Sequence, residues 1–223
     1  MVQFGQEFAI ALGANLETEA GSPADSIRAG LEALELEGIL CVSVSRFYKT
    51  PCFPVGAGPD YVNACAVLRA ELAPEEILAV LHRVEAQMGR VRETRWAGRT
   101  LDLDLLFCAQ TVLPDKAGWS YWQGMALEEQ MRRAPDELIL PHPRLQDRGF
   151  VLVPLADVAP DWQHPVTGRR VVEMRCSAER SAFGHCAAVK RLGNRLVNST
   201  ASTYVKTFQR PTHLLTGVIP WPA

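Results

Sequence analysis

The sequence has no acidic residue after Glu179, so the last 44 of its 223 residues lack the mixed charge of the rest of the chain. It also has no apolar run close to the roughly 18 residues of a membrane-spanning helix, and no basic segment precedes its first apolar stretch. We therefore expect neither a membrane span nor a signal peptide. The formal net charge is only −2, which argues against a general nucleic-acid-binding protein.

Paired cysteine motifs are absent as well. None of the six cysteines forms a Cys-x-x-Cys pair, and Cys41 and Cys65 lie inside apolar patterns typical of strands. Such cysteines are typical of buried, reduced thiols, so we expect a cytoplasmic protein.

The spacing of apolar residues predicts the element order β-α-β-β-α-β. Strands are expected over residues 8–12, 41–48, 61–72 and 99–107, and helices from Pro23, with Ser22 as N-cap, to about Gly38 and from Pro74 to Gly89. This order is the split βαβ arrangement of ferredoxin-like α+β folds, in which helices pack on a mainly antiparallel sheet. A chain of this length and 48% hydrophobic content can bury a sizeable core as one domain.

Two segments lie outside this core. Residues 111–137 form an insertion that carries Trp119, Tyr121 and Trp122, and we interpret it as a packed flap or as an aromatic cap over a ligand. The loss of acidic residues marks residues 177–223 as a C-terminal extension, which leaves residues 1–176 as the main domain.

The strand predicted over residues 99–107 carries two carboxylates on one face. Its alternation places Asp102 and Asp104 opposite an apolar set, which consists of Leu101, Leu103, Leu105 and Phe107. The carboxylates are close enough to share one or two divalent ions, although such a pair is also compatible with the solvent face of an edge strand. Like charges are disfavoured on a strand unless a cation lies between them. An arginine cluster precedes the pair and indicates metal-bound phosphate: Arg83, Arg90, Arg92, Arg95 and Arg99.

Five motifs in a fixed order carry a resemblance to a known family. They are Ala-Leu-Gly-Ala-Asn-Leu at 11–16, Phe-Tyr-Lys-Thr-Pro at 47–51, Asp-Tyr-Val-Asn-Ala at 60–64, Arg-Trp-Ala-Gly-Arg-Thr-Leu-Asp-Leu-Asp at 95–104 and Pro-His-Pro-Arg-Leu-Gln-Asp-Arg-Gly-Phe at 141–150. Over residues 8–175 the chain resembles the 6-hydroxymethyl-7,8-dihydropterin pyrophosphokinases of folate biosynthesis. The resemblance implies an ATP-dependent enzyme that transfers pyrophosphate from ATP to the hydroxymethyl pterin, giving AMP and the pterin diphosphate.

The resemblance also implies roles for individual residues at the ATP end of the site. Asp102 and Asp104 would hold two Mg²⁺ ions and, with Arg90 and Arg99, form the catalytic set. The sequence has no Gly-x-x-x-x-Gly-Lys-Ser/Thr loop to bind phosphates. Arginines replace it in the implied ATP-binding set, which consists of Glu85, Arg90, Arg92, Arg99, His142 and Arg148. For Glu85, an exposed helix face or an internal partner for an arginine is an equally good interpretation.

At the pterin end, the resemblance implies that Tyr61 and Phe150 sandwich the ring and that Trp96 closes over it. Asn63 and the segment of Thr50 and Pro51 would read the amide edge of the ring. Without the resemblance, Tyr61 and Phe150 are equally interpretable as core aromatics. Asn63 is more informative, because a buried amide needs hydrogen-bond partners.

Two other functions are compatible with parts of the pattern. Another magnesium-dependent phosphotransferase or a nuclease could use the same aspartates without a pterin. A non-enzymatic RNA-recognition module could share the βαββαβ order, but the strands lack its Lys/Arg-Gly-Phe-x-Phe element. We expect a monomer that binds ATP and the pterin, with no nucleic-acid or membrane partner.

Overall fold

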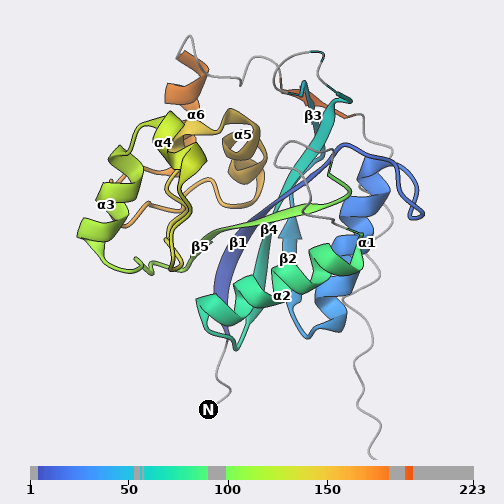
Figure 1. Ribbon diagram of the computed structural model, residues 1–223, viewed down its shortest axis with the longest axis horizontal. Coiled ribbons are helices and arrows are strands. Elements are labelled where there is room, and N and C mark those ends of the chain that lie inside the picture. The colour runs from blue at the N-terminus through green and yellow to red at the C-terminus, as the bar shows by residue number, and fades with distance from the viewer. Residues whose placement is uncertain (1–4, 53–55, 57, 90–98, 181–188, 193–223) are drawn as a thin grey trace, which may run out of the picture. The chain divides into compact units, whose positions relative to one another are not determined.

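The computed structural model describes residues 5–52, 56, 58–89, 99–180 and 189–192. The described residues form one sheet with helices on both faces (Figure 1). The strands are β1 (Gln6–Ala14), β2 (Leu40–Val44), β3 (Tyr48–Thr50), β4 (Tyr61–Ala70), β5 (Asp102–Cys108) and β6 (Lys190–Arg191). The helices are α1 (Pro23–Leu36), α2 (Pro74–Gln87), α3 (Lys116–Gly124), α4 (Leu127–Arg132), α5 (Gly149–Val158), α6 (Val171–Arg180) and the 3₁₀ turn η1 (Leu145–Asp147).

The sheet has the order β5-β1-β4-β3-β6, and β2 pairs with β4 in line with β3. All of these pairs are antiparallel. The predicted βαββαβ order and the ferredoxin-like α+β fold are therefore confirmed. Strand β1 lies between β4 and β5, which brings residues from the middle of the chain next to its beginning.

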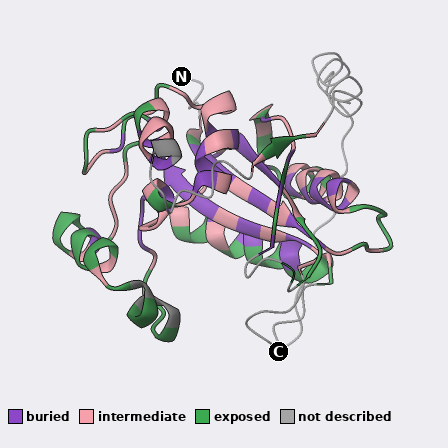
Figure 2. Ribbon diagram, turned by 90° about the horizontal axis from the view of Figure 1, so that it is seen from above, coloured by how far each residue is buried: buried purple, intermediate pink, exposed green. Residues whose placement is uncertain are grey.

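Helices α1 and α2 cover one face of the sheet, as their apolar stripes predict. Strands β1, β4 and β5 contribute alternate apolar residues to this side, and Figure 2 shows the centre of the sheet as mainly buried. Helix α1 begins after Ser22, whose backbone N–H donates to Asp25 Oδ2 at 3.1 Å, and Gly38 ends the segment with a φ of +84°. The start of α2 at Pro74 also agrees with the prediction.

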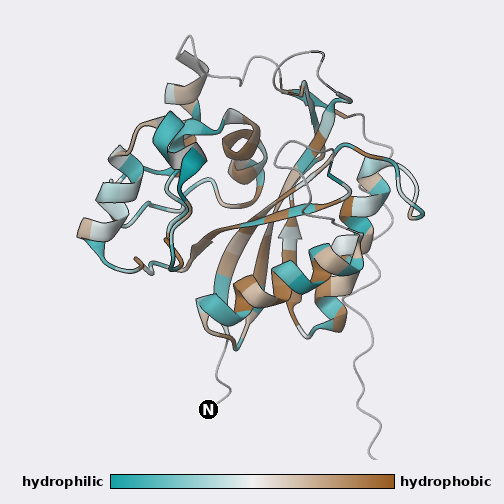
Figure 3. Ribbon diagram, viewed as in Figure 1, coloured by the Kyte–Doolittle hydropathy of each residue, from teal (hydrophilic) through white to brown (hydrophobic). Residues whose placement is uncertain are grey.

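Helices α5 and α6, which the sequence pattern did not reveal, form the layer on the other face. Helix α5 is apolar nearly all round (Figure 3), and it packs on β4 and on α6. Its buried residues join Cys65 of β4 and Leu106 of β5 in a second core cluster. Because helices cover both faces, β4 has a continuous buried run from Asn63 to Leu68.

Two strand predictions needed correction. The pairing of β1 with β5 contains a bulge, so that Ile10 faces Leu105 but Ala9 faces Phe107. Phe107 therefore lies in the second cluster and not with Leu105, because the extra residue reverses the side on which later side chains point. The strand expected over residues 41–48 is divided into β2 and β3. Between them the Ser45 hydroxyl accepts the Cys65 N–H at 2.9 Å and replaces a ladder bond.

The two segments outside the predicted core differ in how far they are described. The insertion contains α3 and α4, which are mostly exposed (Figure 2), although Trp119 is buried. Helix α6 runs past residue 176, and Ala178 on it belongs to the second core cluster. Strand β6 pairs with β3. None of the described helices is long and apolar enough to span a membrane.

A buried histidine makes the fold sensitive to acid. His164 is fully buried between Trp119 and Trp162, and its Nδ1 accepts the Val166 N–H at 3.2 Å. Its Nε2 has no hydrogen-bond partner in the described structure. Burial lowers the pKa of His164 from 6.5 to about 4, because a charged imidazole would lose its hydration.

We predict that stability falls as the pH drops from 6.5 towards 4. The unfolded chain binds a proton in this range and the folded chain does not, so the contribution of His164, up to about 3 kcal/mol, is complete above pH 6.5 and lost below it. Urea unfolding followed by tryptophan fluorescence should show a shallower pH dependence for His164→Asn, which keeps an acceptor for the Val166 N–H. The exposed His82→Asn variant is the control. An unchanged slope in His164→Asn would contradict the assignment.

Candidate active site

The register of three neighbouring strands places the carboxylates and the amide on one face of the sheet. Gly13 of β1 faces Asn63 of β4 on one side and Asp102 of β5 on the other. Residues directly opposite one another in antiparallel strands share a face, so Asn63 and Asp102 flank Gly13 on the same side. Asp104 faces Ala11 one step further along the same face. The opposite side chains of β5 belong to the core under α1 and α2, as predicted.

The predicted pterin residues continue this face across β3. Tyr48 faces Asn63, and Thr50 faces Tyr61. Asn63 Nδ2 donates to Thr50 Oγ1 at 2.7 Å, and both side chains are buried. A Cβ on Gly13 would lie 3.2 Å from Asn63 Oδ1, so the glycine leaves the space beside the amide oxygen open. The structure thus brings Asn63 and Thr50 together, and their role towards a pterin stays a prediction.

Each aspartate forms an ion pair with an arginine. The Arg99 guanidinium binds Asp102, and Arg148 Nη1 lies 2.8 Å from Asp104 Oδ2. Burial by itself would raise the pKa of Asp104, but the positive charges of Arg148 and Arg99 outweigh burial and hold it below its usual value. Each carboxylate of the pair is therefore already partnered by a guanidinium group.

His142 lies beside this cluster, and its backbone and ring are both held. Its N–H donates to the Leu106 carbonyl at 2.8 Å, and its Nδ1 accepts the Arg144 N–H at 3.0 Å. Burial and the neighbouring charge of Arg148 lower the pKa of His142 to about 4. At neutral pH the ring is therefore uncharged, and because Nδ1 is an acceptor its proton is on Nε2.

Glu85 points into the protein and not to an exposed helix face. It is buried on α2, and its Oε1 accepts the Leu103 N–H at 2.7 Å. Leu103 lies between the two aspartates, so this bond ties α2 to the centre of the carboxylate pair. Of the alternatives considered for Glu85, an exposed position is excluded by its burial.

Asn15 connects two segments of the candidate site, although no role was assigned to it from the sequence. Its Oδ1 accepts the Arg99 N–H at 2.7 Å, and its Nδ2 donates to the Pro59 carbonyl at 3.2 Å. It thus joins the start of β5 to the segment that precedes β4. Its place in the first motif, directly after a short buried strand, was a signal that could have identified it.

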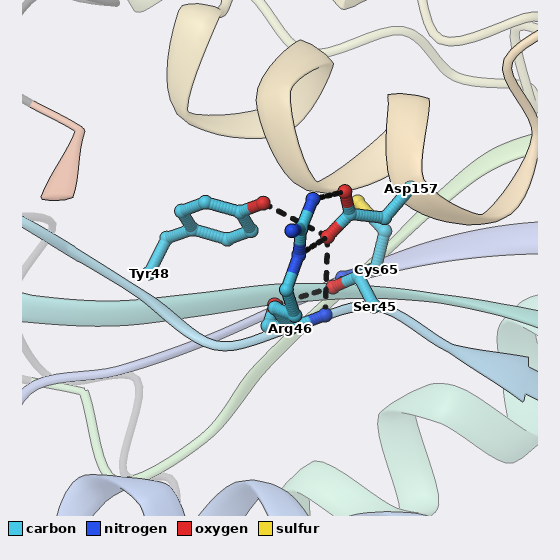
Figure 4. A network of polar contacts seen from close by, with 5 residues as sticks. All are labelled: Ser45, Arg46, Tyr48, Cys65 and Asp157. Carbon is cyan, nitrogen blue, oxygen red and sulfur yellow. Dashed lines mark hydrogen bonds and ion pairs between the residues drawn. The ribbon is translucent and has the colours of Figure 1, made fainter. Parts of the chain in front are cut away.

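A second polar network joins β3 to α5 (Figure 4). Asp157 near the end of α5 accepts from Arg46 Nε at 2.8 Å, from the Arg46 N–H at 3.2 Å and from the Tyr48 hydroxyl at 2.8 Å. Burial opposes ionisation, but these hydrogen bonds outweigh it and lower the pKa of Asp157. Ser45 continues the network by donating to the Arg46 carbonyl at 2.7 Å. Sequence patterns gave no indication of Asp157, because its partners lie more than 100 residues away.

Of the remaining candidate residues, some lie within the described part of the chain and others do not. Phe150 lies in the first turn of α5, and the Arg148 guanidinium lies 6.0 Å from the centre of its ring. Tyr61 is half-buried, and Pro51 follows β3 and is exposed. Three predicted site residues lie outside the described residues: Arg90, Arg92 and Trp96. Arg95, which belongs to the predicted arginine cluster, also lies outside them.

Paired carboxylates with arginine partners, beside a fixed amide on the same sheet face, suit an enzyme that transfers phosphoryl groups. Comparison with known proteins makes the class specific. The family described as 7,8-dihydro-6-hydroxymethylpterin-pyrophosphokinase matches residues 9–160. The chain belongs to this family, and it is an ATP-dependent pyrophosphokinase of folate biosynthesis.

Two pyrophosphokinases of this family are similar in sequence to most of the chain. A 2-amino-4-hydroxy-6-hydroxymethyldihydropteridine pyrophosphokinase of Synechocystis sp. is 35% identical over 188 residues, which cover 84% of this chain and 84% of the relative. The Pseudomonas aeruginosa enzyme of the same name is 37% identical over 170 residues, or 76% of this chain and 90% of its own.

A solved structure of Plasmodium falciparum HPPK-DHPS shows the same fold. It matches 86% of this chain with a TM-score of 0.58 and 13% identity. This chain spans about half of that longer chain, with 48% covered. At this identity the likeness supports the fold and carries no assignment of residues.

We predict that Asp157→Asn lowers the free energy of unfolding by about 1.5–3 kcal/mol, because hydrogen bonds to a charged, largely buried carboxylate are lost. Asp60→Asn is a matched control, since Asp60 pairs with Lys49 in the same region but is 44% exposed, and it should cost less than about 1 kcal/mol. Urea unfolding of both variants measures the difference. Equal effects would show that the network in Figure 4 contributes no more than a surface ion pair.

Proposed function

We propose that the protein transfers the β,γ-pyrophosphoryl group of ATP to the hydroxymethyl group of 6-hydroxymethyl-7,8-dihydropterin, giving AMP and the pterin diphosphate. The observation that carries this proposal is the placement of Asn63 and Asp102 on the same face, on either side of Gly13. A pterin whose edge binds Asn63 would have its hydroxymethyl group directed towards the carboxylates. Such alignment converts an encounter of two substrates into a reaction within one complex.

At the pterin end, Asn63 and Thr50 would read the polar edge of the ring. The bond between Nδ2 and Thr50 Oγ1 fixes the amide, so that Oδ1 is an acceptor of fixed direction. The missing side chain of Gly13 leaves space for the flat ring over β1. Tyr61 and Phe150 would stack on the ring, with Pro51 beside it and Trp96 closing over it, and these four contacts rest on the family resemblance.

At the nucleotide end, Asp102 and Asp104 would hold Mg²⁺. The donor set fits this ion, because Mg²⁺ prefers oxygen ligands and is usually bound by one or two carboxylates together with phosphates and water. Among the described residues no group of three or more His, Cys, Asp or Glu side chains forms a metal site, so phosphate and water would complete the coordination. When bound, Mg²⁺ neutralises phosphate charge and makes the attacking hydroxyl more acidic.

The arginines and His142 would hold the triphosphate. Arg99 and Arg148 now balance the aspartates, and each can bind phosphate oxygens once the carboxylates have another counter-charge. The proton on Nε2 makes His142 a hydrogen-bond donor to the nucleotide. Arg90 and Arg92 would add further positive charge, as the resemblance implies. Glu85 would contribute to ATP binding indirectly, through the Leu103 N–H.

We also propose that the protein acts as a monomer, in which residues 1–176 carry the candidate residues for both substrates. We propose the cytoplasm as its location and residues 1–176 as its catalytic domain. The family membership favours the pyrophosphokinase over the nuclease and RNA-binding alternatives.

We predict that Asp102→Asn and Asp104→Asn each lower kcat by orders of magnitude while weakening ATP binding less. The substitutions preserve volume and remove the charge that would hold Mg²⁺, whereas the arginines still bind the triphosphate. AMP formation measured against Mg²⁺ concentration tests this. The control is Asp147→Asn, which removes a 48% exposed carboxylate that pairs with Arg144. Near-normal, magnesium-dependent turnover by either variant would refute the metal assignment.

We predict that Asn63→Ala weakens pterin binding by about 1–3 kcal/mol, roughly 5- to 150-fold in Kd, because the polar edge of the ring loses its partner. ATP affinity should remain within about twofold, since the amide contacts Thr50 of β3, whereas Arg99 and Arg148 contact the aspartates of β5. Calorimetric titration with each ligand separately measures both values in the same variant. An equal loss for both ligands would place Asn63 outside the pterin site.

A further inference from the structure

The insertion at residues 111–137 lies outside the family motifs, yet it begins and ends at one point of the fold. Leu113 and Leu140 form a pair of backbone hydrogen bonds of 2.9 and 3.2 Å. The insertion is therefore a loop whose two ends are paired with each other, directly before the motif that contains His142. Figure 1 shows α3 and α4 together on the side of the α5 layer.

The first turn of α3 directs one side chain inwards. Asp115 caps the helix by accepting the Gly118 N–H at 2.8 Å. Gly118 packs closely on Pro114, because a Cβ there would lie 2.7 Å from the proline ring. With the turn held in this way, Trp119 is 2% exposed, whereas Tyr121 on the same helix is 55% exposed.

Trp119 holds the peptide unit that carries His142. Its indole Nε1–H donates to the Pro141 carbonyl at 2.7 Å, and the bond is buried. The N–H of the same peptide unit, which belongs to His142, donates to the Leu106 carbonyl of β5 at 2.8 Å. Because the peptide is planar, bonds to its carbonyl and its N–H from two different elements fix the plane and with it the position of the His142 Cα. The imidazole is then held by the Arg144 N–H, which donates to its Nδ1 at 3.0 Å.

Aromatic contacts prevent Trp119 from shifting by itself. Its ring meets the edge of His164 with centroids 4.8 Å apart, and His164 lies 5.6 Å from Trp162. Trp162 stacks on Phe107 of β5 at 3.9 Å, with an angle of 7° between the rings. The series thus starts on the insertion and returns to the strand that bears Leu106, the other partner of the peptide.

We propose that the insertion serves the reaction as a positioning element, in which Trp119 orients the Pro141–His142 peptide so that the imidazole meets ATP. Trp119 is a positioning residue in this scheme, since it acts on His142 through the Pro141 carbonyl. The inference rests on the proposed role of His142 in ATP binding. The proposal assigns a function to a mostly exposed insertion that lies outside the family motifs.

The test is Trp119→Phe, which removes the indole N–H and keeps an aromatic ring against His164. We expect the Kd for a non-hydrolysable ATP analogue to rise about 3- to 10-fold, as the loss of one hydrogen bond predicts, while the Kd for the pterin stays unchanged. Tyr121→Phe is the matched control on the same helix and should change neither value. A purely structural role of Trp119 would weaken both ligands alike or neither, and either result would overturn the proposal.

A double-mutant cycle separates this inference from the role of His142. If His142→Ala weakens the ATP analogue, Trp119→Phe in that background should add less than twofold, because both changes remove one interaction. Full additivity would contradict the positioning role. If His142→Ala leaves ATP affinity unchanged, the proposed role of His142 in ATP binding is wrong. A loss of ATP affinity in Trp119→Phe would then have a cause other than the position of His142, and the positioning proposal would be overturned as well.

Hydrogen exchange of the Trp119 indole proton gives a measurement on the unmodified protein. Coupling between sites is reciprocal, so the ATP analogue should slow this exchange if the bond to Pro141 supports nucleotide binding. The pterin alone should leave the rate unchanged. An indole exchange rate that the ATP analogue does not alter would overturn the proposal, even if Trp119→Phe failed to fold.

Discussion

The site depends on the pairing of β1 with β4 on one side and β5 on the other. This register sets Asn63, Gly13 and Asp102 in a row across three strands. A shift of one residue would turn the amide or the carboxylates into the core under α1 and α2. The two apolar clusters therefore stabilise the strand register on which the site depends, because each face of the sheet buries its own set of side chains.

Charge balance is the second constraint. Two carboxylates two residues apart on one strand repel one another, and the structure compensates each with a guanidinium group from a different segment, Arg99 before β5 and Arg148 before α5. The same groups serve phosphate and metal chemistry in the proposed reaction, so the charges that stabilise the free protein are those that ATP and Mg²⁺ would use. His142 adds a donor without adding a charge, because burial beside Arg148 lowers its pKa to about 4.

Local patterns predicted the helices under the sheet and the face of the aspartates, since these follow from periodicity, N-caps and glycine stops along a few residues. The assignment of Phe107 to the same face as Leu105 was wrong because a bulge depends on the partner strand. Helix α5 was not predicted, as it is apolar nearly all round and has no stripe to read. Asp157 and Trp119 gained their roles from partners distant in the chain.

The sequence by itself determined the family, the βαββαβ order and the identity of most candidate residues, because motifs and periodicity are properties of short segments read in order. Only the tertiary structure decided which of these residues meet. The contact of Asn63 with Thr50, the burial of Glu85 against Leu103 and the bond from Trp119 to Pro141 each join segments separated by other elements. Such contacts are set by strand register and by packing on both sides of the sheet, and neither is encoded within one segment of the chain.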